Sequence, residues 1–191
     1  MLNYVEYGKE NKYDDDIFFQ KYSQMSRSQQ GLAGAGEWET LRKLLPDFKD
    51  KRVLDLGCGY GWHCIYAMEH GASSVVGVDI SHKMLEVAKE KTHFPQVEYK
   101  CCAIEDVEFP EESFDVILSS LAFHYVADYE ILVKKIYRIL KSGGKLVFTV
   151  EHPVFTAYGT QDWHYICTFA MPCYDFRLFS NCNTKISEKS D

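Results

Sequence analysis

The sequence predicts a doubly wound α/β fold built on a mainly parallel sheet. From Arg52 onward, short β-rich runs alternate with helical stretches, as in βαβ units joined by right-handed crossovers. The first of these runs passes directly into a glycine-rich loop followed by a helix, which is typical of ligand-binding turns in such folds. The length of 191 residues is that of a single ordinary domain.

The first fifty residues precede this pattern and predict two helical pieces, at 14–25 and 36–45. Glycines in the intervening stretch 26–34 interrupt a continuous helix, so a loose connection is expected there. The acidic run at 14–16 fits a solvated helix start, because carboxylates are favoured at the positive end of a helix dipole.

Five strands and three helices are expected in the core, which we place at residues 51–155. Ser81 can cap the second helix, and the glycines of 141–144 predict a turn into the last strand. Residues 163–191 show neither strand nor helix periodicity, so an irregular tail is expected over 156–191. The expected strands are 52–56, 74–78, 97–101, 114–119 and 145–150, and the expected helices are 61–70, 81–92 and 129–140.

Composition narrows the range of partners. The 46% of apolar and 26% of charged residues are typical of folded, soluble domains. Twenty-one basic against twenty-eight acidic side chains give a net charge of -7, which would repel a phosphate backbone, so nucleic acid is not an expected partner. Without a secretory leader or a membrane-spanning apolar run, we expect a cytoplasmic protein with no membrane contact.

The seven cysteines predict reduced thiols, since their number is odd and no two form a CxxC pair. A zinc site built from Cys58, His63 and Cys64 would not match a structural zinc spacing. No metal is therefore expected.

The glycine loop at 57–61 predicts a ligand site, because glycine lets a ligand approach the backbone closely. Its spacing is GxGxG, so Trp62 stands where a dinucleotide loop carries its third glycine. Asp55, just before the loop, would oppose a pyrophosphate but favour a ligand that carries an ammonium and a sulfonium. These features favour S-adenosylmethionine over a nicotinamide cofactor, although Asp55 could also be a structural carboxylate bonded to backbone amides.

The second expected strand ends in another acid, Asp79, which can accept hydrogen bonds from both hydroxyls of a ribose. Both kinds of cofactor carry a ribose, so Asp79 supports nucleoside binding without choosing between them. The alternative is an exposed acid at the end of a strand.

Four segments together resemble the class I S-adenosylmethionine-dependent methyltransferases, particularly the small-molecule enzymes with a methyltransferase type 11 domain. The resemblance covers roughly residues 50–155 and implies a Rossmann-like methyltransferase fold in which residues 1–50 form a helical lid. The sheet of that family ends in an antiparallel hairpin that is not recognisable here, so we expect the C-terminal strands to be missing or altered after about Asp162. The four segments are 53–59, 77–81, 109–117 and 141–144.

The resemblance also implies which residues bind S-adenosylmethionine. Gly57 and Gly59 would line the methionine end and Asp79 would hold the ribose. Ala103 stands where relatives often carry an aspartate that helps to bind the adenine, so adenine recognition would depend more on backbone groups and Glu105. The full set expected at the cofactor is Asp55, Gly57, Cys58, Gly59, Asp79, Ile80, Met84, Ile104, Glu105 and Ser119.

His124 is the candidate catalytic base, because it follows the fourth strand at the sheet edge where ligands bind in open α/β folds. It could instead pack against the cofactor or a neighbouring loop. The polar segment 151–153 lies at the same edge and could bind the acceptor or only shape the turn. Tyr22, Arg27 and Trp38 could help to select the acceptor, although ordinary helix packing explains them equally.

Three functions from different classes remain open. The leading prediction is methyl transfer to oxygen, nitrogen or carbon of a small molecule. A non-catalytic cofactor-binding remnant or interaction protein is the alternative, and an NAD(P)-dependent oxidoreductase is disfavoured by the loop spacing and Asp55. The sequence predicts neither the acceptor nor the oligomeric state.

Overall fold

The computed structural model describes residues 11–151 and the backbone of residues 184–188. Most of the predicted tail at 156–191, the proposed change after Asp162 and the residues His152 and Pro153 therefore lie outside the described residues.

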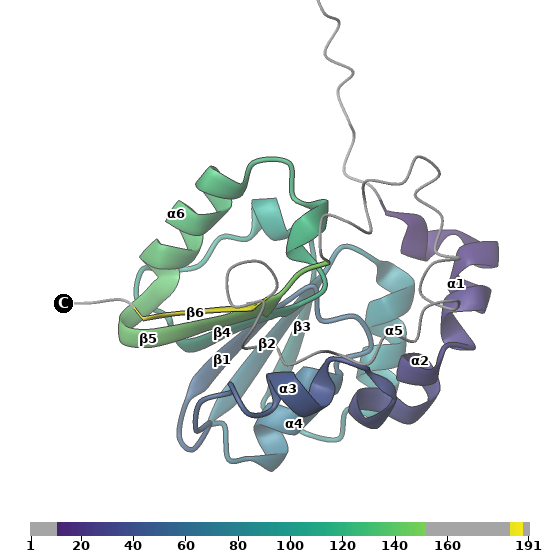
Figure 1. Ribbon diagram of the computed structural model, residues 1–191, viewed down its shortest axis with the longest axis horizontal. Coiled ribbons are helices and arrows are strands. Elements are labelled where there is room, and N and C mark those ends of the chain that lie inside the picture. Colours follow the sequence, from purple (N-terminus) through teal and green to yellow (C-terminus); the bar gives the residue numbers. More distant parts are fainter. Residues whose placement is uncertain (1–10, 152–183, 189–191) are drawn as a thin grey trace, which may run out of the picture.

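A six-stranded sheet forms the centre of the structure (Figure 1), in the order β3-β2-β1-β4-β5-β6. The first five strands run parallel, and the order reverses direction between β1 and β4, which makes the sheet doubly wound. The predicted fold class and five core strands are confirmed. The strands are β1 (Arg52–Leu56), β2 (Ser74–Asp79), β3 (Val97–Cys101), β4 (Phe114–Ser120), β5 (Leu140–Thr149) and β6 (Thr184–Glu188).

The predicted start of β5 at residue 145 is wrong, because the strand begins directly after the preceding helix, at Leu140. Phe114 pairs with Leu140, but Val116 pairs with Lys145, so residues 141–144 stand opposite a single residue of β4. The glycine turn expected at 141–144 is thus a bulge within the strand, and Gly143 takes the left-handed conformation there, with φ at +70°.

The tail contains a strand that the sequence analysis did not predict. β6 pairs antiparallel to β5, with Ile186 opposite Val147. Residues 184–188 are Thr-Lys-Ile-Ser-Glu, so Ile186 is the single aliphatic residue of the strand and no apolar alternation marks it in the sequence. One antiparallel strand is therefore present at the edge where the sequence analysis expected none.

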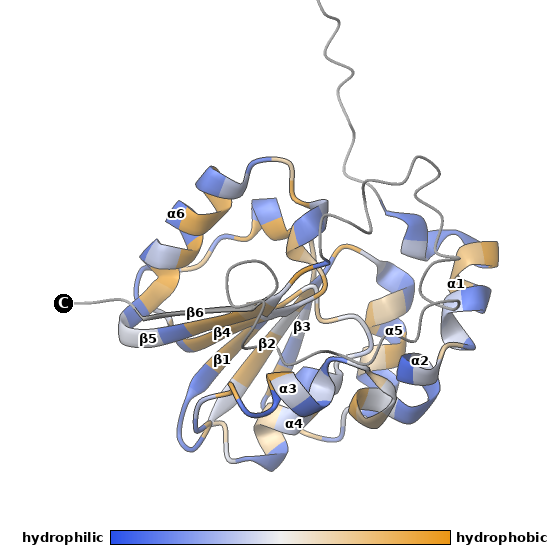
Figure 2. Cartoon of the chain, in the orientation of Figure 1, coloured by the Kyte–Doolittle hydropathy of each residue, from blue (hydrophilic) through white to orange (hydrophobic). Residues whose placement is uncertain are grey.

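Helices cover both faces of the sheet, as Figure 1 shows for α6 on one face and for α4 and the short α3 (Trp38–Leu41) on the other. Among the described residues, the central strands β1, β2 and β4 are mostly hydrophobic, whereas the helices alternate apolar and polar residues (Figure 2). Successive strand residues point to opposite faces. Leu54 and Val78 pack towards α6, and Val53 and Val75 pack towards α3 and α4. The helices are α4 (Trp62–Glu69), α5 (His82–Lys91) and α6 (Tyr129–Ile139).

The N-terminal segment contains more helical elements than predicted, but the predicted helices are shorter: that at 14–25 spans Asp16–Ser23, and that at 36–45 spans only Trp38–Leu41. The stretch 26–34, expected to be loose, contains a short α-helix and a 3-10 turn, and Gly31 ends the α-helix with φ at +63°. This glycine packs on the ring of Trp62, which fixes the turn against α4. The elements are η1 (Lys12–Asp14), α1 (Asp16–Ser23), α2 (Ser26–Gln30), η2 (Gly31–Gly34) and α3 (Trp38–Leu41).

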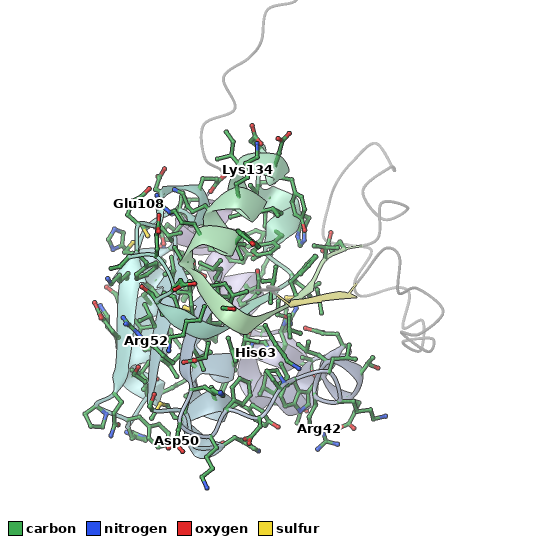
Figure 3. The ribbon with its side chains drawn as sticks, turned by 90° about the vertical axis from the view of Figure 1, so that its left-hand side faces the viewer. Arg42, Asp50, Arg52, His63, Glu108 and Lys134 are labelled. Carbon is green, nitrogen blue, oxygen red and sulfur yellow. The ribbon has the colours of Figure 1, made fainter. Side chains whose placement is uncertain are left out.

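Charged side chains lie mainly on the outside, as the labelled Arg42, Glu108 and Lys134 do in Figure 3, whereas His63 lies in the interior of the same view. Among the helices of the described part of the chain, none has the length and apolar character needed to cross a membrane.

Candidate functional site

The glycine loop after β1 uses the left-handed conformation at alternate positions. The φ angles are +77° at Gly57, +52° at Gly59 and +75° at Gly61, a region that other residues rarely adopt. A Cβ at Gly57 would overlap the Ala122 side chain, and one at Gly61 would overlap the Tyr99 hydroxyl. No described atom lies within 4 Å of the place where a Cβ of Gly59 would stand, so the loop is open at its centre.

The third glycine of the loop, Gly61, provides a close contact between the start of α4 and the sheet. Gly61 caps α4, and its lack of a side chain admits the Tyr99 hydroxyl from β3. The loop is tied to β2 by the N–H groups of Gly57 and Cys58, which both donate to the Val78 carbonyl, at 2.8 and 2.9 Å.

Asp79 holds the loop at its other side. Its Oδ2 accepts the N–H of Gly59 at 2.8 Å, and its Oδ1 accepts the N–H of Ser81 at 2.9 Å. The residue is 9% exposed, and burial raises the pKa of its carboxyl group. Each oxygen keeps capacity for a further donor, so Asp79 can bind two hydroxyl groups without giving up its backbone contacts.

Asp55 lies beneath the loop and is 1% exposed. Its Oδ2 accepts only the weak Sγ–H donor of Cys64, at 3.5 Å, and its Oδ1 has no hydrogen-bond partner among the described residues. Burial raises its pKa to about 7. The alternative of a carboxylate satisfied by backbone amides is therefore not what the structure contains.

The residues expected around an adenine come from two elements that face the same edge of the sheet. Met84 is buried on α5, and Ile80, which directly follows β2, is partly buried. Ile104 and Glu105 begin the 3-10 helix η3 (Ile104–Asp106) after β3. The Glu105 carbonyl accepts a hydrogen bond from the ammonium group of Lys135 at 2.6 Å, which attaches this turn to α6.

Two expected cofactor residues have side chains that are engaged elsewhere. The Cys58 thiol lies in the hydrophobic core between the loop and α4, so this residue presents only its backbone to the open side of the loop. The hydroxyl of Ser119 is buried and donates to the Leu56 carbonyl at 2.8 Å, which joins the ends of β4 and β1.

His124 lies in the 3-10 helix η4 (Phe123–Tyr125), directly after β4. Its Nδ1 accepts the N–H of Glu151 at a long 3.5 Å, while its buried Nε2 has no partner in the described structure. Burial lowers the pKa of the ring to about 4 and raises the pKa of the Glu151 carboxyl group. The imidazole is therefore neutral at physiological pH.

The N-terminal segment reaches the same edge, through residues that the sequence analysis mostly missed. Arg27 forms an ion pair with Glu37, and the Glu37 carboxylate also accepts the hydroxyl of Ser120 at 3.3 Å. The hydroxyls of Tyr13 and Tyr125 lie 3.5 Å apart. Contacts of this kind join residues up to 112 positions apart, so sequence spacing gives no signal for them.

The acidic run at 14–16 also differs from its prediction. Asp15 caps α1 by accepting the N–H of Phe18, but Asp14 points to another helix. Its carboxylate accepts the Ser81 hydroxyl at 2.6 Å and the N–H of Lys83 at 3.2 Å, so Asp14 caps the N-terminus of α5.

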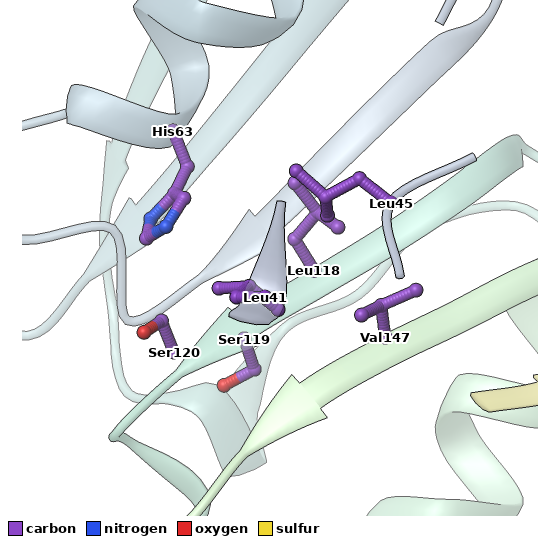
Figure 4. A pocket seen from close by; sticks show the side chains of 7 residues that line it. All are labelled: Leu41, Leu45, His63, Leu118, Ser119, Ser120 and Val147. Atoms are coloured by element: carbon purple, nitrogen blue, oxygen red, sulfur yellow. The ribbon is translucent and has the colours of Figure 1, made fainter. Parts of the chain in front are cut away.

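A small pocket lies between the N-terminal segment and the ends of β4 and β5 (Figure 4). His63 and Ser120 line one side, and Leu45, Leu118 and Val147 line the other. Burial lowers the pKa of His63 to about 4, so its ring is neutral. Within residues 11–151 no group of three His, Cys, Asp or Glu side chains is arranged to hold a metal ion.

Four buried side-chain polar atoms of the described residues have no hydrogen-bond partner. In the described structure they include Oδ1 of Asn11, Oδ1 of Asp55 and Nε2 of His124. Such atoms are rare in folded proteins and each costs about 1 to 3 kcal/mol when nothing satisfies it. The open glycine loop after β1 and the acid that ends β2 are typical of a nucleoside-binding α/β domain.

Comparison with known proteins identifies the family. Residues 54–148 match the family model of the methyltransferase domain, which spans β1 to β5 and includes the glycine loop, Asp79 and His124. The chain belongs to the class I S-adenosylmethionine-dependent methyltransferases.

Three relatives illustrate this likeness. An uncharacterized protein of Haemophilus influenzae is 39% identical in an alignment of 158 positions that covers 76% of this chain and 60% of that protein. A proposed S-adenosylmethionine-dependent methyltransferase from Listeria monocytogenes is 57% identical, with a TM-score of 0.64 over 68% of this chain and 61% of that one. An S-adenosylmethionine-dependent methyltransferase from Mesorhizobium loti is 44% identical, with a TM-score of 0.64 over 66% and 59% of the two chains. The chain thus spans about three fifths of the length of each.

Proposed function

We propose that this protein binds S-adenosylmethionine and transfers its methyl group to a small-molecule acceptor. The observation that carries the proposal is the arrangement of Asp79, the open Gly59 and the unpartnered Asp55 around one loop. The cofactor fits these groups, because it offers ribose hydroxyls to Asp79 and positive charge to Asp55, and it brings no phosphate that the two acids would repel.

The remaining contacts follow from where the side chains lie. Ile80, Met84 and Ile104 would enclose the adenine, and Glu105 would border its edge. The methionine end would pass Gly57 and Gly59, with Cys58 contributing only backbone groups. Ser119 would support the loop from beneath through its bond to Leu56 rather than touch the cofactor. Residues 11–50 would form the lid over this site.

Bound S-adenosylmethionine supplies a methyl group on an activated sulfonium. The protein therefore has to align the acceptor and, where needed, remove one proton from it. His124 is the group that we assign to this task. Its neutral ring can accept a proton at Nε2 if Nδ1 carries the ring hydrogen, which requires giving up the long contact to Glu151. In the other tautomer, Nε2–H would hold the acceptor by donating to it.

An acceptor would lie between His124 and the N-terminal segment, beside Arg27, Glu37 and Glu151. A small polar molecule suits this position, because both signs of charge are present and the groups are partly buried. Oxygen, nitrogen and carbon atoms remain equal candidates for the methylated position.

Binding by a nicotinamide cofactor finds less support. Its pyrophosphate would lie over the loop, close to two acids of which one, Asp55, has no compensating cation among the described residues. A non-catalytic, cofactor-binding protein is the stronger alternative, because the groups around the loop serve binding alone.

Calorimetric titration of the purified chain tests the proposal. Saturable binding of S-adenosylmethionine and S-adenosylhomocysteine is expected, with NAD as the negative control. Asp79→Asn should weaken both by about tenfold or more, since a charged hydrogen-bond acceptor is lost. Asp47→Asn, on an exposed loop at the opposite end of β1, is the matched control and should bind as the wild type does. Absence of binding by the folded chain would refute the proposal.

A screen of small-molecule acceptors with radiolabelled cofactor then separates catalysis from binding. Transfer of label to at least one acceptor, lost in Asp79→Asn, is the expected result. Binding without transfer to any member of a broad panel would favour the non-catalytic protein.

A further inference from the structure

The Asn11 side chain presents a buried polar atom that the cofactor assignment above does not use. Its Nδ2 donates to Oδ2 of Asp14 at 2.8 Å and to the Ile80 carbonyl at 3.4 Å. Its Oδ1 is buried and accepts no hydrogen bond in the described structure. The amide therefore has one end satisfied twice and the other end not at all.

The contacts of Nδ2 determine which way the amide faces. Turned by 180°, the amide would place its oxygen against the Asp14 carboxylate and the Ile80 carbonyl, where all three groups are acceptors. The orientation with Nδ2 towards these two oxygens is thus the stable one. An acceptor atom, and not a donor, is left without a partner.

The segment that carries Asn11 is held firmly at this position. Asp14 accepts the Ser81 hydroxyl and the Lys83 N–H. These contacts do not involve Oδ1 of Asn11. The unpaired acceptor is therefore imposed by the fold, and a donor that satisfied it would recover the free energy lost when the atom was buried.

The surroundings of Asn11 identify the donor. Ile80 directly follows Asp79, and its carbonyl also accepts the thiol of Cys101 at 3.5 Å, so the amide lies where the ends of β2 and β3 meet. That place borders the nucleoside in the proposed function. A nucleoside offers two kinds of donor there, its ribose hydroxyls and its adenine amino group.

We infer that Asn11 is a further cofactor-recognising residue, whose Oδ1 accepts a hydrogen bond from the nucleoside part of S-adenosylmethionine. Asp14 is then a positioning residue, because it orients the Asn11 amide and anchors its segment to α5. This inference rests on the proposed function. It makes the N-terminal segment part of the cofactor site and not only a cover over it.

Calorimetric titration of the full chain with S-adenosylhomocysteine tests this role. Asn11→Ala should weaken binding by about 3- to 10-fold, the range expected for one hydrogen bond. Asp16→Ala is the matched control, because Asp16 belongs to the same segment and contacts the same helix through an exposed ion pair. Its affinity should stay within about twofold of the wild type.

Analogues of the ligand identify the donor. The 2′-deoxy and 3′-deoxy forms of S-adenosylhomocysteine each lack one hydroxyl, and S-inosylhomocysteine lacks the amino group. The wild type and Asn11→Ala should have equal affinity for the analogue that lacks the donor of this hydrogen bond, as in a double-mutant cycle.

Two results would overturn the inference while leaving the proposed function intact. One is wild-type affinity of Asn11→Ala for S-adenosylhomocysteine. The other is an equal loss for all four ligands, which would indicate a purely structural role. Failure of the wild type to bind S-adenosylhomocysteine would instead refute the proposed function itself, and the inference with it.

Discussion

Gly57 and Ala122 are in such close contact that a Cβ on Gly57 would overlap the Ala122 side chain. The two residues belong to the loops that follow β1 and β4, the adjacent strands at which the sheet order reverses. The turn after β4 is itself held in an uncommon backbone conformation, since Leu121 has φ at +54° and its N–H donates to the carbonyl and hydroxyl oxygens of Thr149. The proposed acceptor side and the cofactor loop are therefore packed directly together.

Replacing Gly57 with alanine should destabilise the protein through both the backbone conformation and the overlap with Ala122. Gly143→Ala is the matched control, because Gly143 has a similar φ of +70° but no described atom within 4 Å of the place of a Cβ. Left-handed strain alone costs about 1 to 2 kcal/mol. In urea unfolding, we expect Gly57→Ala to lose at least about 1 kcal/mol more than Gly143→Ala, with equal losses contradicting the contact.

The carboxyl group of Asp55 should make stability depend on pH. Its pKa is about 7 in the folded chain and near the ordinary value of 3.8 when unfolded, so the folded state binds more protons between these limits. Stability from this group is fully present below about pH 4 and is lost as pH rises to about 7, by an amount on the order of a few kcal/mol. Asp55→Asn removes the effect.

Denaturation of both proteins at pH 5 and pH 8 measures this difference. The wild type should lose more stability than Asp55→Asn as pH rises, and comparison of the two cancels the titration of other groups. Parallel pH profiles would show that Asp55 is not protonated in the fold.

Much of the core could be predicted because its signals are local. The apolar run at 53–56 ends at a glycine loop, and Leu132, Ile136 and Ile139 of α6 repeat at helical spacing, so each element is determined by neighbouring residues. The bulge at 141–144 was predicted as a turn because glycines mark both, and only pairing with β4 distinguishes them.

The site could be predicted only where one short segment carries it. The glycine loop and Asp79 can be recognised from neighbouring residues in the sequence. The hydrogen bond between Asp14 and Ser81 cannot, because it joins residues 67 positions apart. Likewise, Cys58 and Ser119 were expected at the cofactor from their positions beside the loop, but the direction of a side chain depends on packing that the sequence does not display.

The partly buried ion pair between Arg27 and Glu37 should contribute more to stability than an exposed one. Their side chains are 25% and 13% exposed, against 73% and 79% for Lys134 and Glu130 on α6. Glu37→Ala leaves Arg27 without its partner and should cost about 2 kcal/mol, whereas Glu130→Ala should cost about 0 to 0.5 kcal/mol. Urea unfolding of the two variants checks this, and a Glu37→Ala loss no larger than that of Glu130→Ala would contradict it.

Replacing His124 with glutamine should separate its proposed role in turnover from its effect on the fold. Its folded pKa of about 4 lies below the ordinary value of 6.5, so the folded ring binds fewer protons and stability rises with pH between those limits. Glutamine does not titrate, so the stability of the variant, measured by urea unfolding at pH 4.5 and 6.5, should not show this rise.

If His124 removes the proton of the acceptor, turnover with an acceptor found by screening should fall by about 100-fold or more, while the affinity for S-adenosylhomocysteine stays unchanged. A lost pH dependence of stability with unchanged turnover would show that the ring is buried as described but serves packing, which would move the search for a base to Glu151 on the same edge.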